Sequence, residues 1–233
     1  MESIKKIPAF IYLDKNGFYF FQDGLPTIIS MAFLQTSVRD MDVINSTSLS
    51  AQVKSFVEQY HLVPSTITII LSPNITFEKD IVDVPVQGRD EAMRNFVDTI
   101  PFESVLSRSF PIEKGVKVIG CNDELYVELK VAFEKVSSTI ENIIPYQMLG
   151  TDQGLLKEFT QENATQLLRR LDRLRQFSLA VAVKEKPQTP QATKETTDVA
   201  KPKRNNTRLI GMVIVFVVLF AILGYMLMNM PKN

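Results

Sequence analysis

The sequence is poor in the residue types that build catalytic and metal centres, since its 233 residues include one cysteine and one histidine. Cys121 has no partner for an internal disulfide, which suits a reducing cytoplasm. His61 has no cluster of cysteine or aspartate around it, so neither a zinc site nor a histidine-based triad can be assembled. We therefore expect no catalytic residue, no metal and no cofactor.

The chain also lacks an excess of charge of either sign, because 26 lysines and arginines balance 26 aspartates and glutamates. A neutral protein has no long-range attraction for nucleic acid, so we expect no nucleic-acid partner. A signal peptide is not expected either. Lys5 and Lys6 are followed by only a short apolar run, which contains Pro8 and ends at Asp14.

What the sequence does have is one long hydrophobic run at residues 209–228, which begins at Leu209, ends at Met228 and contains no charged side chain. A helix of this length extends for roughly 30 Å, the thickness of a bilayer's hydrocarbon core. A buried helix of a soluble domain would need apolar partners on all sides. The polar linker before the run and the short tail at 229–233 offer none. We expect a single transmembrane helix in the lipid bilayer.

The charges beside this run predict its orientation. Only Lys232 follows it, whereas a basic collar precedes it, consisting of Lys201, Lys203, Arg204 and Arg208. Positively charged flanks stay on the cytoplasmic side of a membrane. The sequence therefore predicts a cytoplasmic N-terminal domain on a single-pass anchor in the cytoplasmic (inner) membrane, with residues 229–233 as a short extracytoplasmic tail.

The N-terminal part of the chain is β-rich. Runs at residues 9–13 and 18–21 are separated by a turn that contains Asn16-Gly17, a strong hairpin signal. A third run covers residues 27–33 after a second turn. Together the three runs predict an antiparallel meander.

A helix and a strand are expected next. Ser48 is a candidate N-cap for a helix whose apolar residues share one face. Residues 66–71 form a nearly continuous apolar run, typical of a strand buried beside a parallel neighbour. Three antiparallel strands, a helix and a buried strand are the order of a ribonuclease-H-like half-domain, which we predict at residues 1–74.

Residues 75–150 repeat this mixture as a smaller α+β module. Its expected elements are an extended segment at 75–86, a helix at 89–100 ended by Pro101, strands at 107–112 and 116–121, and a helix at 123–143 capped by Asn122 or Asp123.

An amphipathic helical segment at 151–183 completes the expected cytoplasmic domain. Leucines line one side of it and arginines surround them, the latter being Arg169, Arg170, Arg173 and Arg175. The basic face is either solvated or in contact with the anionic inner leaflet or an acidic partner. Residues 184–208 are rich in lysine, threonine and proline and read as a disordered linker.

The order of features in residues 75–149 resembles a known family. The helix that ends in TIPFE is the most specific part, and it contains Ile100, Pro101 and Phe102. With the extended segment before it and VKVIGC after it, this order is similar to the 1C subdomain of actin-like platform proteins. The families are the PilM proteins of type IV pilus assembly and the L proteins of type II secretion. Residues before 75 fit their 1A subdomain.

The resemblance covers about residues 7–160 and implies an α/β (α+β) chain with a partial actin-like (ribonuclease-H-like) fold of 1A-like and 1C-like subdomains. It also implies a cytoplasmic scaffold whose partners are inner-membrane platform proteins and an assembly ATPase, with homo-oligomers left open. Ile100, Pro101 and Phe102 would end a helix and fill the 1C-like core, or else contact a partner.

This sequence departs from the family in three respects. No second actin lobe is evident, and little chain follows the hydrophobic run. The turn at 14–17 keeps Asp14 and Gly17 but lacks the hydroxyl-rich residues of a phosphate-binding hairpin. Two alternatives to a scaffold stay open: an actin-like ATP-binding protein completed by a partner, and a generic single-pass signalling adaptor.

Overall fold

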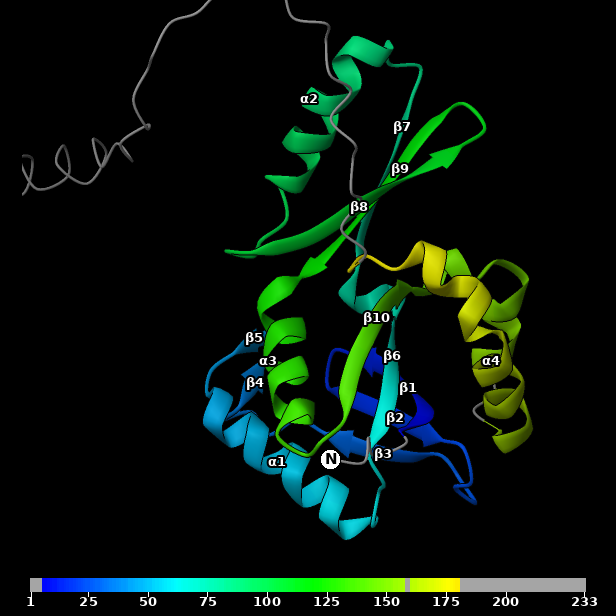
Figure 1. The fold of residues 1–233 in the computed structure, drawn as a ribbon. Coiled ribbons are helices and arrows are strands. Elements are labelled where there is room, and N and C mark those ends of the chain that lie inside the picture. The colour runs from blue at the N-terminus through cyan, green and yellow to red at the C-terminus, as the bar shows by residue number, and fades with distance from the viewer. Residues whose placement is uncertain (1–5, 158–159, 181–233) are drawn as a thin grey trace, which may run out of the picture. The chain divides into compact units, whose positions relative to one another are not determined.

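A five-stranded and a three-stranded β-sheet with helices packed against them, together with a two-stranded hairpin, make up the described part of the chain (Figure 1). The computed structural model describes residues 6–157 and 160–180, all of which belong to one compact unit. The mixed α/β class predicted from the sequence is confirmed.

The first sheet has five strands in the order β10-β6-β1-β2-β3. Their bounds are β1 Ile7–Asp14, β2 Gly17–Gln22, β3 Ile29–Ala32, β6 Ser65–Leu71 and β10 Thr139–Pro145. Strands β1, β2 and β3 form the predicted antiparallel meander. Strand β6 lies between β1 and β10 and runs parallel to both, as its continuous apolar run indicated.

Helices cover both faces of this sheet. Helix α1 (Ser46–Gln59) and helix α3 (Asp123–Glu134) pack on one face, and α4 (Gln161–Leu174) packs on the other. Alternation along β6 explains how one strand serves both layers, since Ile67 and Ile69 face α1 and α3 while Ile70 faces α4. The central strands β1 and β6 are therefore covered on both sides.

The second sheet has three antiparallel strands in the order β7-β9-β8, with helix α2 beside it (Figure 1). The bounds are β7 Phe77–Val82, α2 Val86–Val97, β8 Val105–Ile112 and β9 Gly115–Asn122. The chain enters this module from β6 and leaves it into α3. Helix α3 and strand β10, which the predicted 75–150 module included, pack in the first sheet's layers.

Short elements connect these layers. They are the hairpin β4 Val38–Arg39 and β5 Asp42–Val43, and the 3₁₀ segments η1 Pro73–Ile75, η2 Tyr146–Leu156 and η3 Arg175–Phe177.

The predicted helix at 123–143 is wrong in its second half. Helix α3 ends at Glu134, and residues 139–145 form strand β10. Ser137 adopts a left-handed φ of 65°, which stops the helix, and the apolar residues beyond it are β-branched and suit a buried strand. Ile140 fitted the helical spacing by coincidence.

Two helix starts also differ from expectation. Asn45, not Ser48, caps α1, because its side chain accepts a hydrogen bond from Ser48 N at 2.9 Å. Helix α2 begins at Val86 and ends at Val97, three residues earlier at each end than predicted. Asn122, one of the two residues proposed for α3, is its cap.

The segment at 151–180 contains a shorter helix than expected. Leu167, Leu171 and Leu174 of α4 are buried against the sheet, which confirms an amphipathic helix. Of its arginines, Arg170 is bonded to Asp152. The other three are exposed.

The predicted membrane helix and its basic collar lie outside the described residues. Among residues 6–157 and 160–180, no helix has both the length and the apolar character needed to cross a bilayer. The linker at 184–208 likewise falls outside them.

Candidate functional site

Strand β8 is an open edge of the second sheet, since it pairs only with β9. Asp123 N donates to Ser104 O at 3.1 Å and so fixes which residues of this ladder exchange hydrogen bonds. Such residues alternate in an antiparallel pair, so Val105, Ser107 and Ser109 direct their backbone N–H and C=O groups away from β9. An edge of this kind is a template for pairing with another chain.

A groove of about 390 Å³ lies between this edge and helix α2. Ser107, Ser109 and Val118 line it from the sheet, and Met93 and Val97 line it from the helix. Helix α2 has no fully buried residue, so the apolar side that it turns to the sheet is only partly covered. The small serine side chains leave room beneath the helix.

Charged residues complete the lining of this groove. Asp90, Arg94 and Asp98 come from α2 and its C-cap, and Arg108 comes from β8. The guanidinium of Arg108 is directed to the opposite face of β8, where it bonds to Ser178 O, so two acidic groups and one basic group border the apolar centre. This arrangement suits a segment with an apolar middle and polar ends.

Ile100 and Phe102 of the TIPFE sequence pack inside the second module. Ile100 is buried, and its Cδ1 atom would lie 2.7 Å from a Cβ atom placed on Gly120 of β9. The ring of Phe102 meets Phe77 of β7 edge-on at a centroid distance of 5.7 Å. Pro101, between them, is exposed. The contacts of Ile100 and Phe102 correspond to the core-filling role, while contact with a partner stays a prediction.

The opposite face of β8 meets the last described residues. Arg108 Nη1 donates to Ser178 O at 2.6 Å, and the Arg108 guanidinium lies over the ring of Phe110. Phe110 is buried and packs against Phe177. Strand β8 is therefore supported on one face and open along its edge.

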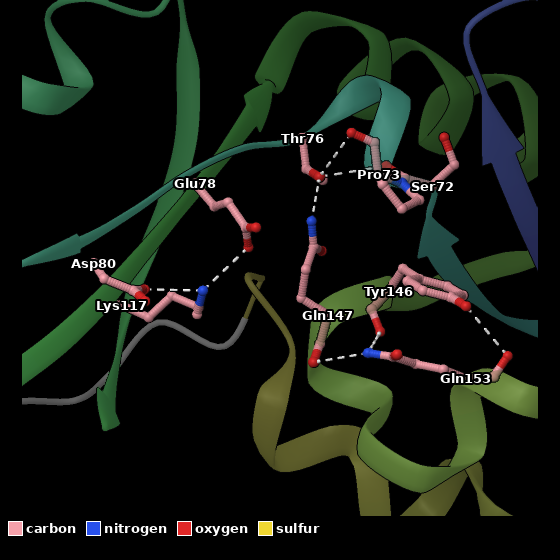
Figure 2. Close-up of polar contacts among 9 residues, drawn as sticks. All are labelled: Ser72, Pro73, Thr76, Glu78, Asp80, Lys117, Tyr146, Gln147 and Gln153. Carbon is pink, nitrogen blue, oxygen red and sulfur yellow. Dashed lines mark hydrogen bonds and ion pairs between the residues drawn. The ribbon is translucent and has the colours of Figure 1, made fainter. Parts of the chain in front are cut away.

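A polar junction connects the loop after β6 with the turn after β10 (Figure 2). Gln147 Nε2 donates to Thr76 Oγ1 at 2.9 Å, and Thr76 Oγ1 in turn donates to Ser72 O at 3.3 Å. Gln153 Nε2 holds the turn by donating to Tyr146 O at 3.3 Å. Gln147 Oε1 is the one buried side-chain oxygen or nitrogen in the described part of the chain that has no partner.

Figure 2 also shows an ion-pair cluster on the second sheet. Lys117 Nζ of β9 lies 2.9 Å from Asp80 Oδ1 and 3.4 Å from Glu78 Oε2, both on β7. The hydrogen bond to Asp80, with further attraction from Glu78, raises the pKa of Lys117. These pairs cross between neighbouring strands and hold β7 on β9.

The turn at 14–17, the candidate phosphate-binding hairpin, is occupied by internal contacts. Asp14 Oδ1 accepts hydrogen bonds from Ser72 Oγ at 2.6 Å and Asn74 Nδ2 at 3.1 Å. A Cβ atom on Gly17 would lie 2.1 Å from Met31 O, so glycine is required here for close pairing of β2 with β3. Asp14 and Gly17 therefore both have a structural role in the turn between β1 and β2.

The single cysteine and the single histidine lie in different parts of the fold. Burial raises the pKa of Cys121 to about 12, so its thiol stays protonated at neutral pH. His61 follows α1 with a left-handed φ of 49°. Within the described ranges, histidine, cysteine, aspartate and glutamate form no group of three or more that could hold a metal ion.

Sequence reasoning predicted strand β8 but not its position at an edge. Strand order in a sheet depends on contacts between distant segments, which local patterns do not reveal. One local signal was present: Pro111 lies in β8, and proline within a sheet is confined mainly to edge strands because it lacks an N–H donor.

Comparison with known proteins gives distant structural likeness only. No protein-family model and no curated protein sequence matches the chain. It is similar to a PilM–PilN type IV pilus biogenesis complex at 13% identity and a TM-score of 0.44, over 65% of this chain and 52% of that chain. It is also similar to the cytoplasmic domain of EpsL, an inner-membrane component of the type II secretion system of Vibrio cholerae. That likeness has 12% identity and a TM-score of 0.35, over 60% of this chain and 57% of that one.

A third similar structure is a Bacteroides thetaiotaomicron protein with an actin-like ATPase fold and unknown function. Its identity is 12% and its TM-score 0.33, over 66% of this chain and 57% of that one. The chain thus spans little more than half the length of the solved structures it matches. Two of the three come from pilus and secretion machines.

Proposed function

We propose that this protein is a membrane-anchored, non-enzymatic scaffold of a type IV pilus or type II secretion-like machine. Its folded domain lies in the cytoplasm, a helix at 209–228 holds it to the inner membrane, and it links an assembly ATPase to platform subunits. The choice of machine rests on the order of sequence features at residues 75–149. The anchor rests on the uncharged hydrophobic run and the basic residues before it.

The open edge of β8 carries the proposed binding role. Val105, Ser107 and Ser109 offer a row of outward N–H and C=O groups, and the groove under α2 lies directly beside them. Strand addition obtains affinity from main-chain hydrogen bonds and specificity from pockets for alternate side chains. Both requirements are met on the same strand.

The shape and lining of this groove support a particular kind of segment. It is extended and pairs with residues 105–109, since Pro111 has no N–H to continue the ladder. Alternate side chains point under α2, where Met93, Val97 and Val118 favour apolar groups. Polar or charged residues at the ends of the segment would meet Asp90, Arg94 and Asp98.

A matched pair of valines on helix α2 tests this role. Val97 lines the groove, whereas Val86 is 70% exposed and outside it. The full-length chain, purified in detergent, is used to recover pilus or secretion ATPase and platform subunits. Val97→Asp should abolish recovery because it puts a charge where an apolar side chain binds, and Val86→Asp should leave it unchanged.

A second variant guards against loss of folding. Ser109→Pro removes one outward N–H, while the bonds to β9 come from the neighbouring residues Arg108 and Phe110. It should also weaken recovery. The proposal would be contradicted if both variants recovered as much ATPase and platform subunit as the unaltered chain does. It would also be contradicted if the unaltered chain recovered no such subunit.

Anchoring and absence of catalysis need separate measurements. The chain should partition with membranes and leave them when residues 209–228 are deleted; free solubility of the full chain without detergent would contradict the anchor. Calorimetry with Mg-ATP should show no binding by the chain, since Ser72 and Asn74 already hold the Asp14 carboxylate. Nucleotide hydrolysis by the chain alone would favour the ATPase alternative.

A further inference from the structure

Strand β3 is an open edge of the first sheet, at the opposite end of the strand order from β10. Phe33 N donates to Asn16 O at 2.9 Å, which fixes the alternation of the β2–β3 ladder. Ser30 and Ala32 therefore direct their backbone N–H and C=O groups outward. No group in residues 6–157 or 160–180 is hydrogen-bonded to them.

A groove of about 550 Å³ lies between this edge and helix α1. We call it the β3–α1 groove; Leu34, Ala51, Ser55, Phe56 and Tyr60 are among the residues that line it. Its other lining residues are serine, glutamine, methionine and alanine, and none carries a charge. Leu34 is 55% exposed and Tyr60 is 37% exposed, so apolar surface faces the solvent at this edge.

This groove differs from the one beside β8 in both place and chemistry. Figure 1 shows β3 at the end of the molecule away from the second sheet, and β8 within that sheet. The β8 groove has four charged residues in its lining, whereas the β3–α1 groove has none. Burying a charge without a partner is costly, so the occupant of the β3–α1 groove must be uncharged where it enters.

Two nearby occupants fit poorly. A second copy that paired through its own β3 would leave the groove unfilled, because the inward side chain of its Ile29 is buried and that of its Met31 packs against its own core. The linker at 184–208 is rich in lysine and proline, which supply charge and remove donors. The occupant must instead bring free apolar side chains on an extended backbone.

We propose that the β3–α1 groove binds an extended, uncharged segment of a partner protein by strand addition to β3. The segment pairs with Ser30 and Ala32 and places alternate apolar side chains over Phe56, between Leu34 and Tyr60. This site is independent of β8. It gives the scaffold a second acceptor edge, so that two partner segments bind one domain at once.

The test uses the full-length chain in lipid nanodiscs and a phage-displayed library of random linear peptides. Enriched peptides should carry apolar residues at alternate positions and no charge between them. Binding should weaken more than about tenfold in Ala51→Glu, which puts a carboxylate in the groove. Thr47→Glu adds the same charge to an exposed position of α1 outside the groove and should leave binding unchanged.

Hydrogen exchange locates the bound peptide. The amides of Ser30 and Ala32 should exchange more slowly with peptide bound, and those of residues 105–109 should not change. Ala51 is exposed, so Ala51→Glu should melt at the same temperature as the unaltered chain.

Several outcomes would overturn the proposal. These are equal binding by both variants, protection at β8 alone, enrichment of charged peptides, or no enrichment. If the free chain forms a dimer and Ala51→Glu dissociates it, the groove would be assigned to a second copy instead. Because the Val97→Asp variant leaves β3 unaltered, failure here is distinguishable from failure at β8.

Discussion

Arg108 donates a hydrogen bond from Nη1 to the carbonyl oxygen of Ser178 at 2.6 Å, and this contact joins strand β8 to the last described residues. Ser178 Oγ also accepts from Ile143 N at 3.0 Å, and Leu179 N donates to Ile143 O at 2.7 Å. The segment at 178–179 is thus fixed along the outer edge of β10. One short segment connects both sheets immediately before the proposed linker.

Arg108→Ala should release this segment. Loss of a hydrogen bond from a charged donor costs roughly 1.5–3 kcal/mol. Part of this cost should appear as easier local opening of the segment at 178–179. The amide of Leu179 should therefore exchange faster with solvent. Arg89→Ala is a suitable control, because Arg89 bonds to Val84 O inside the second module. Equal exchange of Leu179 in both variants would mean that Arg108 does not hold the segment.

Gly120→Ala tests how the TIPFE sequence packs. The new Cβ atom would lie 2.7 Å from Ile100 Cδ1 and 3.1 Å from Val105 Cγ1, so the substitution should destabilise the fold by about 1–3 kcal/mol. Ile100→Val removes the Cδ1 atom and should recover part of this loss in the double variant. Thermal unfolding of the four proteins measures the coupling, and simple additivity would show that the two residues do not touch.

Capping of α1 offers a comparison of two candidates. Asn45→Ala should lower the free energy of unfolding by about 1 kcal/mol, because Ser48 N loses its acceptor. Ser48→Ala should have little effect, since the Ser48 side chain is not the cap. Urea unfolding measures both. A larger loss for Ser48→Ala would restore the assignment that the sequence favoured.

These cases show what local sequence could and could not predict. The meander, the buried parallel strand and the two hairpin strands of the second module followed from alternation, apolar runs and turn residues. Strand β10 was missed because residues 135–143 also fit a helical spacing. The structural feature that separates the end of helix α3 from strand β10 is the left-handed conformation of Ser137. The β4–β5 hairpin was missed for a different reason. Its turn residues Asp40 and Met41 adopt positive φ without glycine.

The candidate sites depend even more on long-range order. Strands β8 and β3 are edges because β8 pairs only with β9 and β3 pairs only with β2, and this order depends on contacts between distant segments. The grooves arise because α1 and α2 leave part of each sheet uncovered. The amphipathic pattern of a helix indicates which face is buried, but not how completely its neighbour covers it.

Packing of α4 can be tested with neighbouring leucines. Leu167 is fully buried between the helix and the sheet, whereas Leu168 is only partly buried. Leu167→Ala should cost about 2–5 kcal/mol, and Leu168→Ala clearly less. Thermal melts of the two variants provide the measurement. Equal losses would mean that α4 does not present the predicted face to the sheet.

The Asp14 carboxylate makes a contribution to stability that depends on pH. Burial acts to raise its pKa, but hydrogen bonds from Ser72, the Lys15 backbone and Asn74 outweigh burial and hold the pKa below its ordinary value of 3.8. A carboxyl group whose pKa is lower in the folded than in the unfolded state stabilises the fold above the unfolded pKa. That stabilisation is lost as the pH falls through the folded pKa.

Asp14→Asn should therefore unfold more easily than the unaltered chain at neutral pH, and the gap should narrow as the pH drops below 3.8. Ser72→Ala keeps the carboxylate but removes its shortest hydrogen bond, so the pKa of Asp14 should rise. Urea unfolding across this pH range measures the first effect, and NMR titration of the Asp14 carboxyl carbon measures the second. A gap that does not vary with pH, together with an unchanged titration in Ser72→Ala, would mean that Ser72 and Asn74 do not hold this carboxylate, and the turn at 14–17 would again be open to a phosphate-binding role.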